Sequence, residues 1–269
     1  MQLSRVTPLI LTYNEEANIG RSLQRLSWAE RIVVVDSYST DDTLRIADEY
    51  QQVDIFQREF DHFSHQCNYG LEQIETDWVL SLDADYMVSE EFVDEMCQLP
   101  SPPPVDGYTV PFRFCVYGTP LRSTLYPPRT VLYRRSSASY RRDGHAHRVK
   151  ITGSTRRLDT FIYHDDRKPL RRWIEAQRHY TEDEMGRYRT KSPAELSWPD
   201  WFRLYKWSPL LVFFYCLLWK GLILDGKAGV YYALQRTYAE LLSVLMIMEE
   251  ELRTGADEPK KEEEKPPEV

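Results

Sequence analysis

Short apolar runs alternate with amphipathic stretches over the first hundred residues of the chain. The runs are typical of buried strands, and the stretches between them have the apolar spacing of helices. The expected strands cover residues 7–13, 31–37, 53–59 and 77–83, and the expected helices cover residues 15–26, 40–50 and 66–74. This alternation predicts an α/β fold with a mostly parallel central sheet and helices on both faces.

A proline-rich segment at residues 99–107 marks a change of pattern. Beyond it we expect a mixed, partly antiparallel continuation of the sheet, with strands at residues 108–116, 130–133, 147–151 and 158–163. From residue 169 onward the pattern is helical. The predicted organisation is an α/β domain at residues 1–166, a helical C-terminal region at residues 167–253 and a disordered acidic tail at residues 254–269.

One segment of the helical region is strongly apolar. Residues 209–224, PLLVFFYCLLWKGLIL, are fewer than the roughly 20 apolar residues that span a bilayer, and Lys220 and Gly221 interrupt them. Lys206 and Trp207 precede the segment and are residue types that favour the headgroup zone. We expect this segment to lie in a membrane interface, with a buried helical hairpin packed on the sheet as the alternative.

The charge distribution limits the class of ligand. A formal net charge of -8 argues against a general nucleic-acid-binding protein. Arginines nevertheless recur between residues 122 and 172, which predicts an anionic ligand there or, alternatively, a solvated basic face. The 4 cysteines form no CxxC pair and are expected to be reduced thiols, and the N-terminal apolar run breaks too early for a signal peptide. Both observations favour a cytoplasmic location.

Polar side chains follow the ends of the expected strands. Asn14, Asp36 and the pair Asp83 and Asp85 fall at the carboxyl ends of three of them, where ligands bind in open α/β sheets. Capping of the following helices would also account for Asn14 and for the turn after Asp36. The pair Asp83 and Asp85 is more specific, because hard cations such as Mg²⁺ and Mn²⁺ prefer carboxylate and phosphate oxygens.

Four stretches in this order resemble the family 2 glycosyltransferases, which have the nucleotide-diphospho-sugar transferase fold called GT-A. They are LTYNEEANI, VVVDSYSTDDT, HQCNYGLEQIETDWVLSLDADY and FIYHDD. Within the family, the chain looks most like the lipopolysaccharide core glucosyltransferase-like branch, and the stretch at residues 222–250 resembles the C-terminal segment of that branch.

The resemblance implies a role for each matching residue. Thr12, Asn14 and Glu15 would surround the nucleotide, Asp36 would bind its base, and Gln66 and Asn68 would lie near the diphosphate-sugar. Asp83 would contact the ribose or the donor sugar, and Arg129 would contact a diphosphate or a phosphorylated acceptor. Asp85 and His164 would bind a divalent cation, Mg²⁺ or Mn²⁺, with the nucleotide-sugar as co-substrate.

The general base departs from the pattern of the branch. Inverting transfer requires a group that takes the proton of the acceptor hydroxyl. Arg148 follows His147 where glutamate is expected. We therefore expect Asp143 to be the base, with His147 or His145 as alternatives whose imidazole suits neutral pH.

The sequence thus predicts a metal-dependent, inverting glycosyltransferase on the cytoplasmic face of the inner membrane. The expected donor is a UDP-sugar and the expected acceptor is a glycolipid, such as lipopolysaccharide core or a polyprenyl-linked glycan. Two alternatives remain open: sugar transfer to polyprenyl phosphate, whose own phosphate would attack, and a non-catalytic membrane-associated partner protein that kept the fold.

Overall fold

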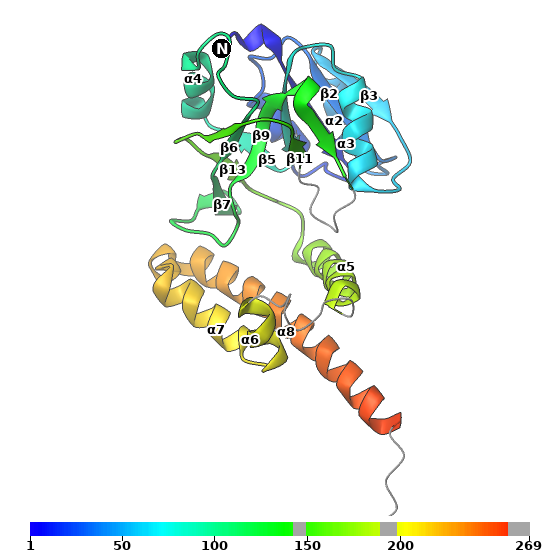
Figure 1. The fold of residues 1–269 in the computed structure, drawn as a ribbon, viewed down its shortest axis with the longest axis vertical. Coiled ribbons are helices and arrows are strands. Elements are labelled where there is room, and N and C mark those ends of the chain that lie inside the picture. Colours follow the sequence, from blue (N-terminus) through cyan, green and yellow to red (C-terminus); the bar gives the residue numbers. More distant parts are fainter. Residues whose placement is uncertain (142–148, 189–197, 258–269) are drawn as a thin grey trace, which may run out of the picture.

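The computed structural model describes residues 1–141, 149–188 and 198–257. Figure 1 shows two parts, a sheet with its covering helices and a group of helices that follows it in the chain. Asp143 and His147, the residues expected to act as the base, lie outside the described residues.

A seven-stranded sheet forms the centre of the first part, in the order β12-β6-β9-β4-β1-β2-β3. Its strands are β1 (Val6–Thr12), β2 (Ile32–Asp36), β3 (Val53–Gln57), β4 (Trp78–Asp83), β6 (Gly107–Val110), β9 (Arg129–Arg134) and β12 (Thr155–Arg157). Only β9 runs antiparallel to its neighbours within this sheet. The prediction of a mostly parallel central sheet is confirmed.

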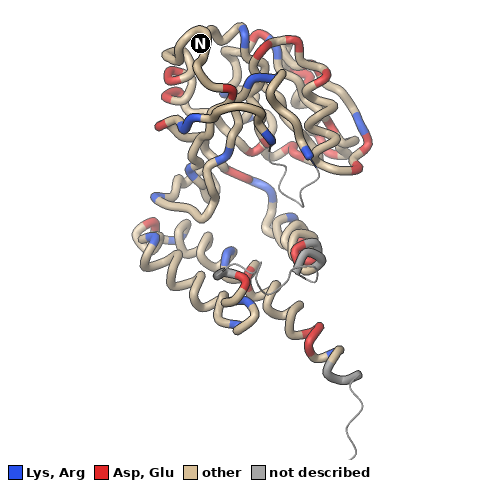
Figure 2. Tube along the Cα trace, viewed as in Figure 1, with Lys and Arg blue, Asp and Glu red and all other residues tan. Residues whose placement is uncertain are grey.

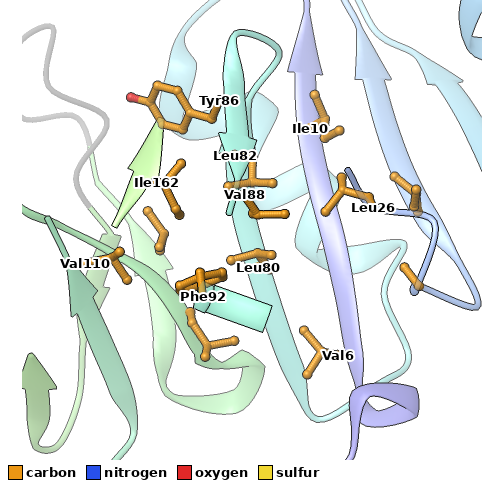
Figure 3. Close-up of a cluster of buried hydrophobic side chains, with 14 of the residues drawn as sticks. Val6, Ile10, Leu26, Leu80, Leu82, Tyr86, Val88, Phe92, Val110 and Ile162 are labelled. Carbon is orange, nitrogen blue, oxygen red and sulfur yellow. The ribbon is translucent and has the colours of Figure 1, made fainter. Parts of the chain in front are cut away.

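The first two helices of this part are shorter than the pattern predicts, the third begins earlier than expected, and the fourth was not predicted. They are α1 (Ile19–Gln24), α2 (Thr43–Asp48), α3 (Phe63–Glu72) and α4 (Glu90–Gln98). The residues of β2 are all buried, which explains why the strand reads as a continuous apolar run. One apolar cluster surrounds Ile10, Leu80 and Phe92 (Figure 3), and a second one lies around Leu9, Val33 and Val79. The helices cover both faces of the sheet by packing on these two clusters.

A second, four-stranded sheet has the order β5-β13-β7-β8. Its strands are β5 (Tyr86–Val88), β13 (Ile162–His164), β7 (Phe112–Val116) and β8 (Thr119–Pro120), and β10 (Ala138–Tyr140) pairs separately with β11 (Val149–Ile151). The single strand expected at residues 108–116 is therefore wrong, because β6 and β7 belong to different sheets and separate at Pro111.

The strand expected at residues 158–163 is also mostly wrong. Only Ile162 and Tyr163 of that range belong to β13. The preceding residues form a loop, because the carboxylate of Glu95 accepts the backbone N–H groups of Asp159 and Thr160, each at 3.1 Å.

The second part consists of the helices α5 (Leu170–Tyr188), α6 (Trp198–Leu204), α7 (Ser208–Phe214) and α8 (Gly226–Asp257), with the π-helical turn η4 (Tyr215–Trp219) and the 3-10 turn η5 (Leu222–Asp225). The predicted interfacial segment 209–224 thus comprises α7, η4 and η5, and the break between η4 and η5 lies at Gly221, which takes a left-handed conformation with φ 68°. Helix α8 continues to Asp257, beyond the predicted boundary at residue 253.

None of the helices in the described ranges passes by itself as a membrane span. The bent pair formed by Ser208–Trp219 and Leu222–Thr254 meets the requirements of length and composition together, with a bend of 70°.

Candidate active site

The loops after β1 and β2 are locked together by Asp36, which is fully buried. Its Oδ1 accepts hydrogen bonds from the hydroxyls of Thr12 (2.8 Å) and Ser39 (2.5 Å), and its Oδ2 accepts one from the backbone N–H of Ser39 (2.8 Å). The carboxylate therefore shapes the two loops. Contact of Asp36 with a base remains a prediction.

Asn14 completes this arrangement from the first loop. Its backbone N–H donates to Ser39 Oγ and its Oδ1 accepts from the N–H of Thr40, each at 2.8 Å. These bonds explain why Asn14 tolerates a positive φ of 55°. Tyr38 has a φ of 59° and is exposed, so the second loop carries strain at a bulky residue. Strain of this kind gathers at functional sites.

Glu15 connects the first loop to the segment that follows β13. Its carboxylate accepts hydrogen bonds from Lys168 Nζ (2.5 Å) and Asn18 Nδ2 (2.8 Å), and Asn18 also donates to Asp166 (2.9 Å). Burial raises the pKa of Glu15 to about 7, although Lys168 opposes this shift. The carboxyl thus belongs to a partly buried polar cluster at the edge of the site, and Lys168 belongs to the basic stretch that the sequence placed in this neighbourhood.

The two aspartates of the DAD stretch lie at the end of β4, as predicted. Asp85 Oδ2 lies 3.1 Å from His164 Nε2, and the backbone N–H of Asp165 donates to the carbonyl of Asp85 at 3.0 Å. Burial alone would lower the pKa of His164, but the carboxylates of Asp85 and Asp83 outweigh it and raise the pKa. The structure thereby brings together Asp85 and His164, which are 79 residues apart in sequence.

Aromatic rings surround His164. The ring centres of Phe114, Tyr126 and Tyr86 lie 4.6, 4.9 and 5.2 Å from that of the imidazole. The hydroxyls of Tyr86 and Tyr126 are hydrogen-bonded to each other. The motifs did not predict that aromatic rings surround His164, although Tyr86 directly follows Asp85 in the sequence.

Arg129 supplies the positive charge of the site. It begins β9, and its guanidinium lies 4.6 Å from the ring centre of Tyr126. Burial alone would lower its pKa, but Tyr86, Tyr126 and the two aspartates outweigh this and raise it. Arg129 also lines a cavity of about 260 Å³ together with Asp83. Arg129 therefore lies beside Asp83, and its contact with a diphosphate or a phosphorylated acceptor stays a prediction.

Two of the amides predicted to lie near the diphosphate-sugar are engaged by the protein itself. Gln66 donates to Ser37 Oγ (2.8 Å) and to the carbonyl of Arg58 (2.9 Å). Asn68 donates to the carbonyl of Tyr140 (2.9 Å) and accepts the N–H of the same residue (3.0 Å). In this structure Gln66 braces the loop after β2 and Asn68 holds β10.

The donor set suits a cation with few protein ligands. Among the residues that the structure describes, no group of three or more His, Cys, Asp or Glu side chains is placed to hold a metal. Asp85 Oδ1 and His164 Nδ1 are nevertheless buried without a hydrogen-bond partner in the same residues. Buried polar atoms without a hydrogen-bond partner are rare in proteins, so a bound ion would account for them. A hard cation that also binds substrate phosphate oxygens and waters needs only one or two protein carboxylates.

The sheet, its covering helices and the acidic strand ends define the GT-A fold. The match to a family model shows to which family of this fold the chain belongs. Residues 9–157 match the model of glycosyl transferase family 2, more than half of the chain. The protein belongs to glycosyl transferase family 2, as the motifs predicted.

Individual relatives match over shorter stretches. An uncharacterized glycosyltransferase of Rickettsia typhi is 32% identical over 95 residues, 35% of this chain and 32% of the relative. The SPbeta prophage-derived glycosyltransferase SunS of Bacillus subtilis is 34% identical over 89 residues, 32% of this chain and 21% of the relative. These matches span about a third or less of the length of the curated relatives.

Among solved structures, S. aureus TarS 1–349 in complex with UDP-GlcNAc aligns over 93% of this chain and 92% of its own, with 16% identity and a TM-score of 0.49. Glucosyl-3-phosphoglycerate synthase from Mycobacterium tuberculosis aligns over 40% of this chain and 44% of its own, with 18% identity and a TM-score of 0.34.

Proposed function

We propose that this protein is an inverting glycosyltransferase that moves a sugar from a nucleotide-diphosphate-sugar donor to a hydroxyl of an acceptor glycan. The proposed donor is a UDP-sugar. Family membership supports the reaction class. The single observation that carries the proposal is the mostly buried pair formed by Asp85, just after β4, and His164, at the end of β13, with one buried unpartnered polar atom on each among the described residues.

The reaction needs a nucleophile, a leaving group and a base. The oxygen of the acceptor hydroxyl attacks the anomeric carbon, the bond from that carbon to the diphosphate oxygen breaks, and UDP leaves with the electron pair. The hydroxyl proton goes to a protein base, for which Asp143 or His147 remain the candidates. Arg129 lies beside Asp83 and would attract the diphosphate, because a guanidinium pairs well with phosphate oxygens.

Asp85 and His164 are the residues that would hold Mg²⁺ or Mn²⁺. A cation bound there would neutralise the charge that develops on the leaving diphosphate. The buried surroundings of His164 would exclude water and strengthen that interaction.

The acceptor is proposed to be an anionic glycolipid, such as a lipopolysaccharide core or a polyprenyl-linked glycan, at the cytoplasmic face of the inner membrane. The resemblance to the lipopolysaccharide core branch supports this, and so does the surface of the helical region. Trp219 and Leu224 at the turn between α7 and α8 are 81% and 69% exposed. Figure 2 shows α7 and the neighbouring half of α8 with few charges. Large exposed apolar patches mark interaction sites.

The donor site is tested by the thermal midpoint of the purified protein with UDP, GDP or CMP, each with and without Mn²⁺. A ligand that binds only the folded state at 100 times its Kd adds about 2.7 kcal/mol, so the midpoint should rise with UDP and Mn²⁺ together. Asp85→Ala should abolish the shift, whereas Asp48→Ala, at an exposed carboxylate, should keep it. No shift with any nucleotide would contradict the proposal.

A further inference from the structure

A cavity of about 260 Å³ lies beside the acidic pair, between the central sheet and the β10–β11 hairpin. Its lining residues from the sheet are Ser81 and Asp83 of β4, Thr109 of β6, and Arg129, Thr130 and Val131 of β9. Tyr140 and Val149 close it from the hairpin, and Pro127 and Pro128 lie at its margin. It therefore adjoins the proposed catalytic centre without including the loops that follow β1 and β2.

The position of the cavity follows from the strand order. The sheet continues from β2 to β1, β4 and β9. Because β9 is antiparallel to β4, its first residue Arg129 lies at the same edge as the carboxyl end of β4. Three strand spacings separate β2 from β9, about 14 Å. A nucleotide-sugar laid along this edge would place its base at β1 and β2, its diphosphate at β4 and its sugar at β9.

Hydroxyl groups dominate the polar part of the wall. Thr109 Oγ1 and Thr130 Oγ1 are hydrogen-bonded to each other at 2.9 Å, and the Tyr140 hydroxyl donates to Ser81 Oγ at 3.1 Å. Each hydroxyl offers one donor and two acceptor positions, so these pairs keep hydrogen-bonding capacity for a ligand. Asp83 and Arg129 are the charged residues of the wall and have opposite sign.

The size and the chemistry of the cavity suit one uncharged sugar ring. Pockets for drug-sized ligands occupy roughly 300–1,000 Å³, so a cavity of about 260 Å³ has room for about one sugar ring. The hydroxyls can pair with the hydroxyls of a ring, and the apolar faces of Val131 and Val149 can pack on its carbon atoms.

We propose that the cavity holds the sugar of the donor and that the paired hydroxyls of Thr109 and Thr130 select which sugar it is. This rests on the proposed transferase function and adds to it the residues that set donor-sugar specificity. A wall built to hydrogen-bond a substrate hydroxyl discriminates strongly against sugars that lack it, because its own polar groups are then left unpaired.

The test compares UDP with UDP-glucose, UDP-galactose, UDP-GlcNAc and UDP-GalNAc by calorimetric titration of the whole chain with Mn²⁺. One UDP-sugar should bind more tightly to the wild type than UDP does. The double variant Thr109→Val/Thr130→Val removes both members of the hydroxyl pair, so neither partner is left unpaired. It should keep its affinity for UDP and lose about tenfold in affinity for that UDP-sugar, the equivalent of 1.4 kcal/mol.

Val149→Phe tests the cavity independently, since the larger side chain would fill the cavity from the hairpin side. It should also spare UDP and weaken the UDP-sugar. Thr119→Val, at an exposed threonine of β8, is the matched control and should change neither.

Four outcomes would overturn the inference. The double variant could bind the UDP-sugar as the wild type does, or lose UDP and UDP-sugar affinity equally, which would indicate a structural role. The wild type could also bind UDP with no gain from any sugar, which would refute the sugar pocket and leave the proposed function standing. A wild type that binds no nucleotide would refute both.

Discussion

At the scale of single residues, Asn68 shows how one side chain fixes a neighbouring element. Its amide makes two hydrogen bonds with the backbone of Tyr140 and so holds β10 against α3. Tyr140 in turn lines the proposed sugar pocket. Asn68 therefore supports the wall of that pocket from behind.

Asn68→Ala should lower the free energy of unfolding by about 1–3 kcal/mol, because it leaves a backbone N–H and a carbonyl without partners. The affinity of the folded variant for UDP should stay close to that of the wild type. Urea unfolding and calorimetric titration measure the two quantities. Gln73→Ala, just after the C-terminal end of α3, is the control, since its side chain makes only one hydrogen bond among the described residues, at 3.3 Å from Nε2 to the carbonyl of Tyr69. A large loss of UDP affinity with unchanged stability would instead favour the ligand contact that the sequence predicts for Asn68.

The same residues show what the motifs can and cannot reveal. The strand-end argument correctly put Asp83 at the carboxyl end of a strand of the parallel sheet. The pairing of Asp85 with His164 was implied only by the family motifs, because His164 ends β13 of the second sheet. They could not reveal that the carboxylate of Asp36 accepts hydrogen bonds from Thr12 and Ser39, since such partners depend on how two loops fold over each other.

At the scale of elements, α8 approaches η5 closely at Gly229. A methyl group added to Gly229 would lie 1.8 Å from the carbonyl oxygen of Leu222, far inside van der Waals contact. Leu222 is fully buried in the apolar cluster that joins the turn to Leu121 and Phe114. The glycine thus allows α8 to pack closely on η5, whose Leu222 lies in the same apolar cluster as Leu121.

Gly229→Ala should therefore destabilise the junction by 1 kcal/mol or more, on the order of other overpacking substitutions, although alanine is the better helix former. Lys227→Ala, at an exposed position of α8 two residues earlier, should have little effect. Thermal unfolding followed by circular dichroism compares the two variants. A Gly229→Ala protein with a higher midpoint than the wild type would contradict the close contact.

A buried ion pair ties α6 to α8. Arg203 donates to both carboxylate oxygens of Glu240, at 2.8 and 2.7 Å, and both side chains are nearly buried. Removing one partner of a buried pair costs about 3–5 kcal/mol when the other charge is left uncompensated. Arg203 keeps a hydrogen bond to Glu184 at 2.7 Å, so Glu240→Ala should reduce the free energy of unfolding by less, about 1.5–3 kcal/mol. Glu251→Ala breaks the more exposed pair with Lys206 and should cost less than about 1 kcal/mol.

The pH dependence of this pair has a definite sign. Burial alone would raise the pKa of Glu240, but the hydrogen bonds and charge of Arg203 outweigh it and lower the pKa below its ordinary value of 4.5. The stabilisation is therefore fully present above that ordinary value and is lost as the pH falls through the folded pKa. Urea unfolding at several pH values should show the wild type and Glu240→Ala converging in acid. A difference that stays constant down to the lowest pH would contradict this assignment.

Periodicity predicted most strands of the sheet but misplaced the one at residues 158–163. Leu158 and Ile162 are both buried, as in a strand, yet the backbone between them is a loop held by Glu95. Burial spacing alone cannot distinguish these cases, because the loop hides the same side chains as a strand would. The break at Gly221 was visible in the sequence, but its left-handed conformation was not.

At the scale of the whole molecule, the helical region has two different faces. Cys216, Leu217 and Leu222 face inward and pack with Leu121 of the first part, whereas Trp219 and Leu224 point outward. One side of the segment 209–224 therefore belongs to the apolar core, whereas membrane contact of its exposed side stays a prediction.

The outward side gives the last prediction. Trp219→Ser/Leu224→Ser should leave the fold intact, because both side chains are largely exposed, and should release the protein from vesicles of anionic phospholipid. Each buried large apolar side chain contributes about 1.5–3 kcal/mol, so removing two should weaken binding by on the order of 100-fold or more. Sedimentation with vesicles measures this, and Phe60→Ser, at an exposed residue of the first part, is the matched control.

Salt and oligomeric state separate the possible partners of this surface. Lys220 and Lys227 lie beside the apolar turn, so lipid binding should weaken with rising salt as the attraction to anionic headgroups is screened. If the turn instead joined two copies of the chain, the double variant would shift the protein from dimer to monomer in ultracentrifugation without lipid, and wild-type vesicle binding would be absent. That result would remove the support for a membrane-bound acceptor while leaving the donor site at β4 and β9 untouched.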